Sequence, residues 1–330
     1  MTVERRRGGR GNKHSMIRNT RRNARGGETN KEIKDDLLVV GPGVLGTRIA
    51  RVWKNICNDD DEMRRENRVT AKARSEETVQ KLRTNEKDVF DSVVATWEED
   101  TNEKGESRLY RHVVFAAPPS GNANYSAEVA AAAQRVDWSD DAASFVFTGS
   151  AGIYAVQEGE CCEDAEVNPA SSSERTARLV ASEEACIAAG GCVLRLAGLY
   201  HATRGAHSYY LSLMRAGKTA DASAHALLNL IHYDDAATLV VAALRKGARS
   251  AVYLGADGAP ISRDAMMRAT LEASCSREEA DALGASLENG NFFVGRIDAP
   301  EGKRLNAQWT RTKLEWEPAH ASFDVSIAQT

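Results

Sequence analysis

A glycine-rich turn, Gly41-Pro42-Gly43-Val44-Leu45-Gly46, has the residue types and spacing of a phosphate-binding loop. Gly41 permits a tight turn, Gly43 lets the backbone approach a pyrophosphate, and Gly46 lets the following helix pack closely on the strand. The turn follows the apolar run 37–40 and precedes a helical stripe over residues 47–56, so its amides would lie at a helix start, where phosphates bind. We therefore predict a dinucleotide site at Gly41, Gly43, Val44, Leu45 and Gly46.

The residues that follow the second expected strand bear on the choice of cofactor. An Asp or Glu at the end of that strand favours NAD, whereas a basic residue favours the 2′-phosphate of NADP. The strand begins at Val69 and is followed by Lys72 and Arg74, with no acidic residue at its end. We therefore predict NADP as the preferred cofactor, NAD as the alternative, and Lys72 and Arg74 as cofactor-binding residues. A competing interpretation pairs Arg74 with Glu76 or Glu77 at a helix start.

The elements that must position these residues alternate between strands and helices. Apolar strand-like runs recur from Leu37 to Phe147 and are separated by helical patterns, and the alternation continues through a strand at 192–199. Such alternation is typical of βαβ units and a parallel sheet. We predict an α/β fold that is Rossmann-like, with a doubly wound parallel sheet of six or seven strands. Ser171 and Glu174 have capping-box spacing and predict a helix that begins near them.

Composition excludes several classes of protein. The chain has 330 residues, of which 42% are hydrophobic and 27% charged. These shares are ordinary for a soluble globular protein and exclude wholesale disorder and a collagen-like repeat. No apolar run approaches the roughly 18–20 residues of a membrane-spanning helix, so no membrane partner is expected. The six cysteines form no CxxC pair, and we expect no metal site.

Charge divides the chain into a basic tail, residues 1–35, and a body, residues 36–330. Residues 1–34 carry eleven Lys or Arg and three Glu, a net charge of +8, whereas the remainder carries −12. An Arg-rich N-terminus favours a transit segment for a plastid or another organelle, although Ser15 is its only serine. The alternatives are a solvated extension of a cytoplasmic protein and, through Arg-Gly clusters, an RNA contact. For the body we expect no nucleic-acid partner.

Several short motifs follow the glycine-rich turn in a characteristic order. They are Ala116-Ala117-Pro118-Pro119, Thr148-Gly149-Ser150-Ala151-Gly152-Ile153-Tyr154, Val193-Leu194-Arg195-Leu196-Ala197-Gly198-Leu199-Tyr200, Asn229-Leu230-Ile231-His232-Tyr233-Asp234-Asp235-Ala236 and Lys303-Arg304-Leu305-Asn306. Over residues 37–323 this series resembles the short-chain dehydrogenase/reductase superfamily, specifically its extended and atypical members with NAD-dependent epimerase/dehydratase domains. The resemblance implies a Rossmann-like fold, cofactor contacts at Ala117 and Pro118, and a smaller C-terminal substrate lobe drawn from about residues 201–228 and 260–330.

The family's catalytic group is only partly present. It consists of a Ser or Thr after the fifth strand, a Tyr, and a Lys four residues later that helps the Tyr exchange a proton with a substrate oxygen. Ser150 falls on the serine position, but Glu174 and Arg178 stand where the Tyr and Lys are expected. Arg178 could still position the nicotinamide ribose, or could form a surface pair with Glu174. Tyr154 could supply the phenol or pack beneath the site. The catalytic candidates are therefore Ser150, Tyr154 and Arg178.

Other polar residues have both a structural and a functional interpretation. Arg195 lies in an apolar strand and needs a partner, for which we expect an acid such as Asp234. Asp234 or Asp235 is expected to cap a helix over 236–246. His201, Arg204 and His207 follow the sixth strand, where they could contact substrate or lie in a loop.

The resemblance and the dinucleotide motif together favour an NAD(P)-dependent oxidoreductase or epimerase-like enzyme. We expect a small polar or sugar-related substrate as its partner, in a monomer or a homodimer. The absent Tyr and Lys support an alternative, a catalytically silent NAD(P)-binding sensor or scaffold.

Overall fold

The computed structural model of the protein describes residues 35–59, 68–296 and 299–329. The expectations for the basic tail, including import and RNA contact, lie outside these residues. The central strands, in chain order, are β1 (Leu37–Val40), β2 (Val69–Lys72), β3 (Ser92–Val94), β4 (His112–Phe115), β5 (Ser144–Ser150), β7 (Cys192–Leu196) and β11 (Val252–Gly255). The helices that flank them are α1 (Val44–Asp59), α2 (Glu76–Asn85), α3 (Tyr125–Ala133), α4 (Glu174–Ala188), α6 (Tyr233–Lys246) and α9 (Gln308–Leu314).

The central strands form one seven-stranded sheet in the order β11-β7-β5-β4-β1-β2-β3, and every pairing is parallel. Strand β1 pairs with β2 on one side and with β4 on the other, so that Leu37 is opposite both Val69 and His112. The chain order reverses at β1, and this reversal creates a crevice at the carboxyl ends of the strands. The prediction of a doubly wound parallel sheet is confirmed.

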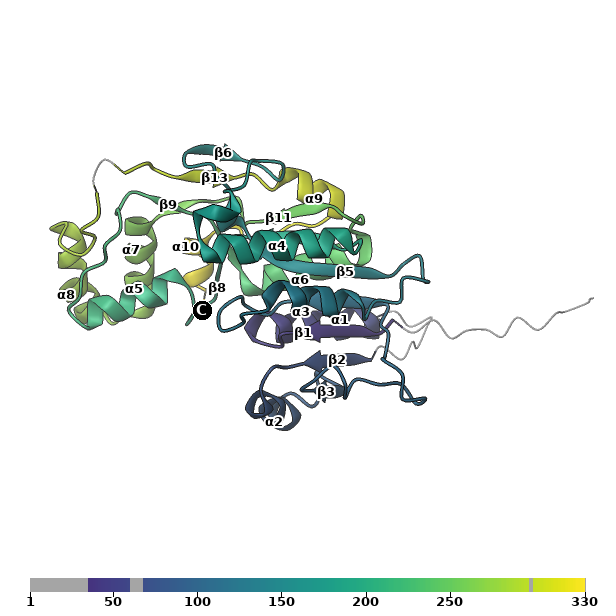
Figure 1. The fold of residues 1–330 in the computed structure, drawn as a ribbon. Coiled ribbons are helices and arrows are strands. Elements are labelled where there is room, and N and C mark those ends of the chain that lie inside the picture. The colour runs from purple at the N-terminus through teal and green to yellow at the C-terminus, as the bar shows by residue number, and fades with distance from the viewer. Residues whose placement is uncertain (1–34, 60–67, 297–298, 330) are drawn as a thin grey trace, which may run out of the picture. The chain divides into compact units, whose positions relative to one another are not determined.

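Helices cover both faces of this sheet (Figure 1). On one face α1 packs against α6, and Leu37 and Val39 of β1 belong to the same hydrophobic cluster as Ile49. On the other face α3 packs against α4, and Leu38 and Val40 belong to a second cluster. Successive side chains of a strand point to opposite faces, so a strand buried on both faces must be apolar throughout. The unbroken apolar run of β1 therefore reflects its central place in the sheet.

A third hydrophobic cluster lies in the C-terminal half of the chain. It is built around Met266, Met267 and Phe323, all of them fully buried. Its helices, α5 (Ala206–Arg215), α7 (Arg263–Ser274) and α8 (Arg277–Glu288), lie together to one side of the sheet in Figure 1. The short helix α10 (Phe323–Ile327) packs against α7. This cluster and the sheet belong to one unit of the chain, residues 34–330.

Short strands and two 3₁₀ turns connect these parts. Strand pairs join β8 to β10, β9 to β12, and β6 to β13. Their bounds are β6 (Gly159–Cys161), β8 (Gly198–Tyr200), β9 (Leu227–Leu228), β10 (Leu230–His232), β12 (Ile261–Ser262) and β13 (Lys303–Leu305), and the turns are η1 (Ala151–Ile153) and η2 (Ala170–Ser172). In the described part of the chain, no helix combines the length and apolar character needed to cross a bilayer.

Two predicted helix caps are wrong. The helix predicted near Ser171 begins at Glu174, and its cap is Ser173, whose hydroxyl accepts the amide of Thr176 at 3.0 Å. Ser171 lies instead in the turn η2. Helix α6 begins at Tyr233, three residues before the predicted start, and its cap is His232 rather than either aspartate. In both places several residues in a row are able to cap, and the surrounding structure selects one of them.

Candidate cofactor and active site

The glycine-rich turn lies at the carboxyl end of β1, where α1 begins. Gly41 has a positive φ of 85°, and a Cβ there would lie 2.4 Å from the Ala117 nitrogen. A Cβ at Gly46 would lie 2.4 Å from the Gly41 oxygen. At Gly43, by contrast, a Cβ would meet no described atom within 4 Å. The chain therefore requires glycine at Gly41 and Gly46 for its own packing, whereas the place of a Cβ at Gly43 is open space.

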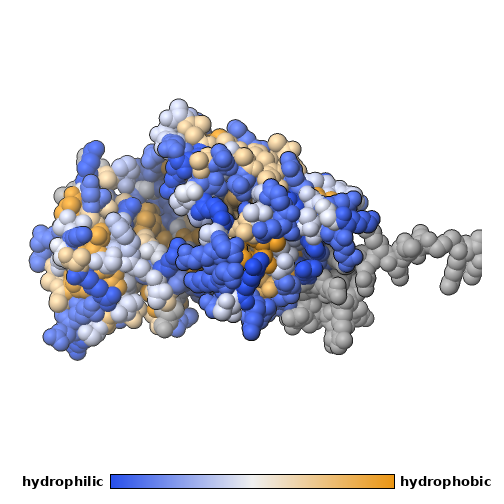
Figure 2. All heavy atoms as spheres, turned by 60° about the horizontal axis from the view of Figure 1, so that its bottom comes forward, coloured by the Kyte–Doolittle hydropathy of each residue, from blue (hydrophilic) through white to orange (hydrophobic). Residues whose placement is uncertain are grey.

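A cavity of about 610 Å³ opens at this turn. Its walls come from segments that follow the carboxyl ends of β1, β4, β5 and β7, joined by residues from the C-terminal half. Of the residues predicted from the sequence, the cavity brings together Gly43, Val44, Leu45, Ala117, Pro118, Ser150 and Arg204. Figure 2 shows a hollow between the part of the molecule that holds α5, α7 and α8 and the part that holds the sheet.

Ser150 ends β5 at the wall of the cavity. Its Oγ accepts the amide of Gly152 at 3.2 Å, which fixes the oxygen at the start of the turn η1. Among the described residues, no hydrogen bond takes up the hydroxyl hydrogen, so this hydrogen is available to an oxygen in the cavity. The nearby Thr148 hydroxyl, in contrast, donates to the Phe115 carbonyl at 3.1 Å.

Tyr154 does not join Ser150 in the cavity. Its side chain is 1% exposed, and its hydroxyl donates to the Glu163 carbonyl at 3.1 Å. The Arg195 guanidinium lies 4.8 Å from the ring centroid. Burial raises the pKa of Tyr154 to about 12. These contacts give the phenol a structural position beside the site rather than a position facing it.

Glu174 and Arg178, which occupy the positions of the expected Tyr and Lys, form an ion pair with each other. Arg178 also donates to the Pro119 carbonyl at 3.4 Å, and Pro119 lies in the cavity wall. Glu174 is largely exposed, with 82% of its side chain open to solvent. The pair therefore links the start of α4 to the loop after β4 from outside the cavity.

The two basic residues at the end of β2, Lys72 within the strand and Arg74 beyond it, are placed differently. The Lys72 side chain is only 9% exposed, with its Nζ 3.9 Å from a Glu128 carboxylate oxygen and 5.0 Å from the Trp97 ring centroid. Arg74 is exposed and donates to the Gly121 carbonyl at 3.0 Å, and not to the glutamates considered from the sequence. Of the two, Arg74 is the side chain that is open to solvent.

The predicted partner of Arg195 is wrong. Arg195 pairs with Glu183 of α4 at 2.7 Å, and both side chains are at least 90% buried. Asp234 pairs instead with Arg48 of α1 at 2.7 Å. A buried arginine must be paired, as expected, but the helix packed above the strand supplies the acid.

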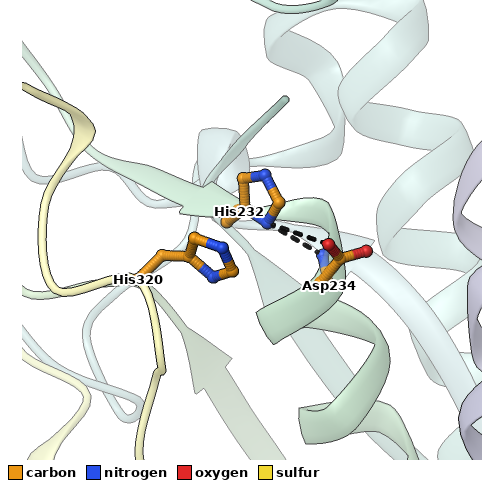
Figure 3. A group of neighbouring side chains, drawn as sticks. All are labelled: His232, Asp234 and His320. Atoms are coloured by element: carbon orange, nitrogen blue, oxygen red, sulfur yellow. Dashed lines mark hydrogen bonds and ion pairs between the residues drawn. The ribbon is translucent and has the colours of Figure 1, made fainter. Parts of the chain in front are cut away.

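His232, Asp234 and His320 form a group of side chains near the start of α6 (Figure 3). The Nδ1 of His232 accepts the backbone amide of Asp234 at 3.2 Å and lies 3.6 Å from the Asp234 carboxylate. The two imidazole rings are stacked with centroids 3.8 Å apart, and His320 lies 3.1 Å from Asp235. Because its Nδ1 lone pair accepts the helix amide, His232 serves as the cap of α6.

Several cavity residues were not singled out from the sequence, namely Arg175, Asn229, Tyr233 and Lys303. Lys303 donates to the Tyr154 carbonyl at 2.9 Å, and burial lowers its pKa. The Asn229 amide bonds the Lys303 carbonyl and the Leu305 amide, each at 2.8 Å, and so holds β13 against the cavity. Asn229, Tyr233 and Lys303 do lie within motifs noted in the sequence, and this was the signal available for finding them.

The lining of the cavity has a marked charge bias. Arg175, Arg204 and Lys303 line it, and no Asp or Glu is among its described lining residues. His201 and His207, the other candidates after β7, are not among the lining residues. The His207 ring is buried and its Nε2 lies 3.3 Å from the Ala202 carbonyl, whereas His201 packs against the Tyr233 ring. The cavity therefore suits an anionic ligand.

No family model and no curated protein matches the chain, whereas many solved structures do. A functionally unknown conserved protein from Silicibacter pomeroyi DSS matches with a TM-score of 0.62 and 16% identity over 90% of this chain and 98% of that one. UDP-glucuronic acid 4-epimerase from Bacillus cereus, in complex with NAD, matches with a TM-score of 0.64 and 13% identity over 89% and 94%.

A third match extends the same result. dTDP-glucose 4,6-dehydratase from Bacillus anthracis, in complex with NAD, has a TM-score of 0.64 and 12% identity over 89% of this chain and 94% of that one. These matches span nearly the whole of the described sheet and C-terminal cluster, and identities this low establish the fold alone. The chain thus has the Rossmann-like fold of the NAD-dependent epimerases and dehydratases, as the motifs indicated.

Proposed function

We propose that the protein is an NAD(P)-dependent oxidoreductase or epimerase-like enzyme that acts on a small polar or sugar-related substrate. The observation that carries this proposal is that Gly43, the residue before α1, lines the same cavity as Ser150 and has open space where a Cβ would lie. Unfilled space over a helix N-terminus is what a pyrophosphate requires. The epimerase and dehydratase structures of the same fold, which were solved with NAD, add support.

The residues of the cavity have complementary roles in this proposal. The amides of Val44 and Leu45 and the dipole of α1 would hold the pyrophosphate. The bound cofactor would supply or accept a hydride. The Ser150 hydroxyl would donate a hydrogen bond to the substrate oxygen, and the Lys303 ammonium would stabilise negative charge on that oxygen as the hydride moves.

Turnover in a Ser150→Ala variant tests the enzymatic part of the proposal. We expect NADPH oxidation with a panel of small carbonyl compounds and sugars, and we expect Ser150→Ala to lower kcat by about a hundredfold, the usual effect of removing one oxyanion donor. Ser126→Ala, a half-buried serine of α3 outside the cavity, is the matched control. Equal kcat values in Ser150→Ala and the wild type would contradict the role of Ser150.

We further propose NADP as the preferred cofactor, with Arg74 rather than Lys72 as the residue that contacts the 2′-phosphate. Arg74 is exposed beyond the end of β2, and its guanidinium uses only Nη1 in its bond to Gly121. Lys72 is held between Glu128 and Trp97 and has little exposed surface. No acidic residue stands at the end of β2 to bond a free ribose 2′-hydroxyl.

Removal of the Arg74 side chain tests this preference. Arg74→Ala should weaken NADPH binding about tenfold, because one charge-assisted contact is lost, and should leave NADH binding unchanged. Lys81→Ala, an exposed cation on α2, serves as the control. Calorimetric titration of both cofactors gives two dissociation constants for each variant and two for the wild type. An equal loss for NADH and NADPH, or tighter binding of NADH by the wild type, would show that the preference is wrong.

The catalytically silent NAD(P)-binding module is the second candidate. The observation that favours it is the ion pair of Glu174 with Arg178 at the positions where a Tyr and a Lys are expected, together with the bonding of Tyr154 away from the cavity. This candidate predicts tight cofactor binding with no turnover on any panel substrate. Measurable turnover that depends on Ser150 would exclude it.

A further inference from the structure

We propose that Arg204 is a second anchor for the cofactor. Its guanidinium would bind the pyrophosphate oxygens from the side opposite the glycine-rich turn. This inference rests on the proposed function and adds to it a side chain from the C-terminal half of the chain. The first amides of α1 provide one half of a phosphate site. The contact with Tyr233 places the Arg204 guanidinium where it can provide the other half of the phosphate site.

A short, fixed turn presents Arg204 to the cavity. His201 and Arg204 exchange two backbone hydrogen bonds, at 2.9 and 3.0 Å. The next residue, Gly205, has a φ of 143°, and a Cβ there would lie 2.9 Å from the Tyr200 Cβ. Residues with side chains rarely adopt this conformation. The backbone that carries Arg204 is therefore held in one place before any ligand binds.

A continuous set of contacts joins Arg204 to the glycine-rich turn. The Nε of Arg204 donates to the Tyr233 hydroxyl at 3.0 Å. The Tyr233 ring lies 5.4 Å from the guanidinium carbon of Arg48, and Arg48 donates to the Val44 carbonyl at 3.4 Å. Val44 is the first residue of α1 and lines the same cavity as Arg204 and Tyr233. Arg204 is thus connected, through the side chains of Tyr233 and Arg48, to the helix start that would hold a phosphate.

Arg204 is the member of this group whose charge is not matched by an acid. Arg48 is paired with Asp234 at 2.7 Å, whereas no described carboxylate lies within ion-pair distance of Arg204. Its bond to Tyr233 uses only Nε, so both terminal nitrogens are available. A planar guanidinium with two free nitrogens binds phosphate oxygens in a bidentate manner. Burial lowers the pKa of His201, and the positive charges of Arg48 and Arg204 lower it further, whereas Asp234 opposes the shift.

Binding of ADP-ribose, which carries the pyrophosphate without the nicotinamide, tests the proposal in the full-length protein. Arg204→Met should weaken the binding of ADP-ribose about tenfold, because the charge-assisted hydrogen bonds are lost. Arg204→Lys should lose less affinity for ADP-ribose. Tyr233→Phe should also weaken the binding of ADP-ribose, because it releases the Arg204 side chain. Binding of 2′-AMP, which has a phosphate but no pyrophosphate, should remain within about twofold in every variant.

Arg215→Met is the matched control, because this exposed arginine at the end of α5 pairs with Glu279 and does not line the cavity. Urea unfolding verifies that each variant folds. Unchanged ADP-ribose binding in Arg204→Met would overturn the proposal and assign the side chain to an anionic substrate instead. An equal loss of affinity for 2′-AMP in Arg204→Met would also overturn the proposal. If the wild type binds neither ADP-ribose nor NADPH, the proposed function itself fails, a result visible without any variant.

Discussion

Asp257, just after β11, lies in surroundings that disfavour its charge. Its carboxylate is 4% exposed, and one oxygen accepts the Ala259 amide at 2.9 Å. The other oxygen is buried without a hydrogen-bond partner among the described residues. The nearby Arg311 guanidinium donates at 2.6 Å to the backbone carbonyl of Asp257 and not to its carboxylate. Burial therefore raises the pKa of Asp257 to about 7.

This raised pKa predicts how stability depends on pH. Between about pH 4 and 7 the folded protein holds a proton on Asp257 that the unfolded chain has released, so wild-type stability falls as the pH rises, and above about pH 7 this contribution is constant. Asp257→Asn should remove this fall in stability, because an amide does not ionise. The amide oxygen of the new side chain can still accept the Ala259 amide. From pH 5 to pH 8 the variant should gain on the order of 2–3 kcal/mol of unfolding free energy relative to the wild type.

Urea unfolding at the two pH values measures this difference. Asp221→Asn, which replaces an exposed aspartate, should track the wild type at both pH values. A constant offset between Asp257→Asn and the wild type from pH 5 to pH 8 would mean that Asp257 titrates normally in the folded protein.

At the scale of the elements, local patterns predict some features well and others poorly. The strand, turn and helix around Gly41 were predicted correctly because each depends on neighbouring residues. An apolar run buried on both faces, a turn that only glycine can form, and a helical stripe are all visible in sequence. Helix starts were less predictable, because Ser171 and Ser173 can both cap and only the surrounding structure selects Ser173.

Contacts between distant elements could not be read from spacing at all. The acid that pairs with Arg195 comes from α4, which packs above the strand, and not from the motif that contains Asp234. Lys303 reaches the cavity because β13 pairs with β6, placing Lys303 opposite Gly159. Ser150 and Tyr154 are close in sequence, yet only Ser150 faces the cavity, because the turn between them directs the phenol toward Glu163. These features are determined by tertiary packing, which a single sequence does not reveal.

At the scale of the molecule, net charge and the charge of the cavity differ in sign. Residues 35–330 carry a net charge of −12, whereas the charged residues that line the cavity are all cations. A net negative charge does not attract a polyanionic cofactor. In the proposed function, the binding energy for a dinucleotide would therefore come from local contacts with the amides of α1 and the cavity cations.

Calorimetric titration of NADPH into the wild type and into Gly43→Ala tests that proposed binding most directly. The account predicts one cofactor per chain in the wild type and binding weakened by about tenfold or more in Gly43→Ala, because the added methyl group occupies the open space at the residue before α1. The unfolding midpoint should not change, since a Cβ at Gly43 meets no described atom. Gly284→Ala, whose Cβ likewise meets no described atom, should bind as the wild type does. Equal binding by Gly43→Ala and the wild type, or no binding of NADPH or NADH by the wild type, would contradict the account.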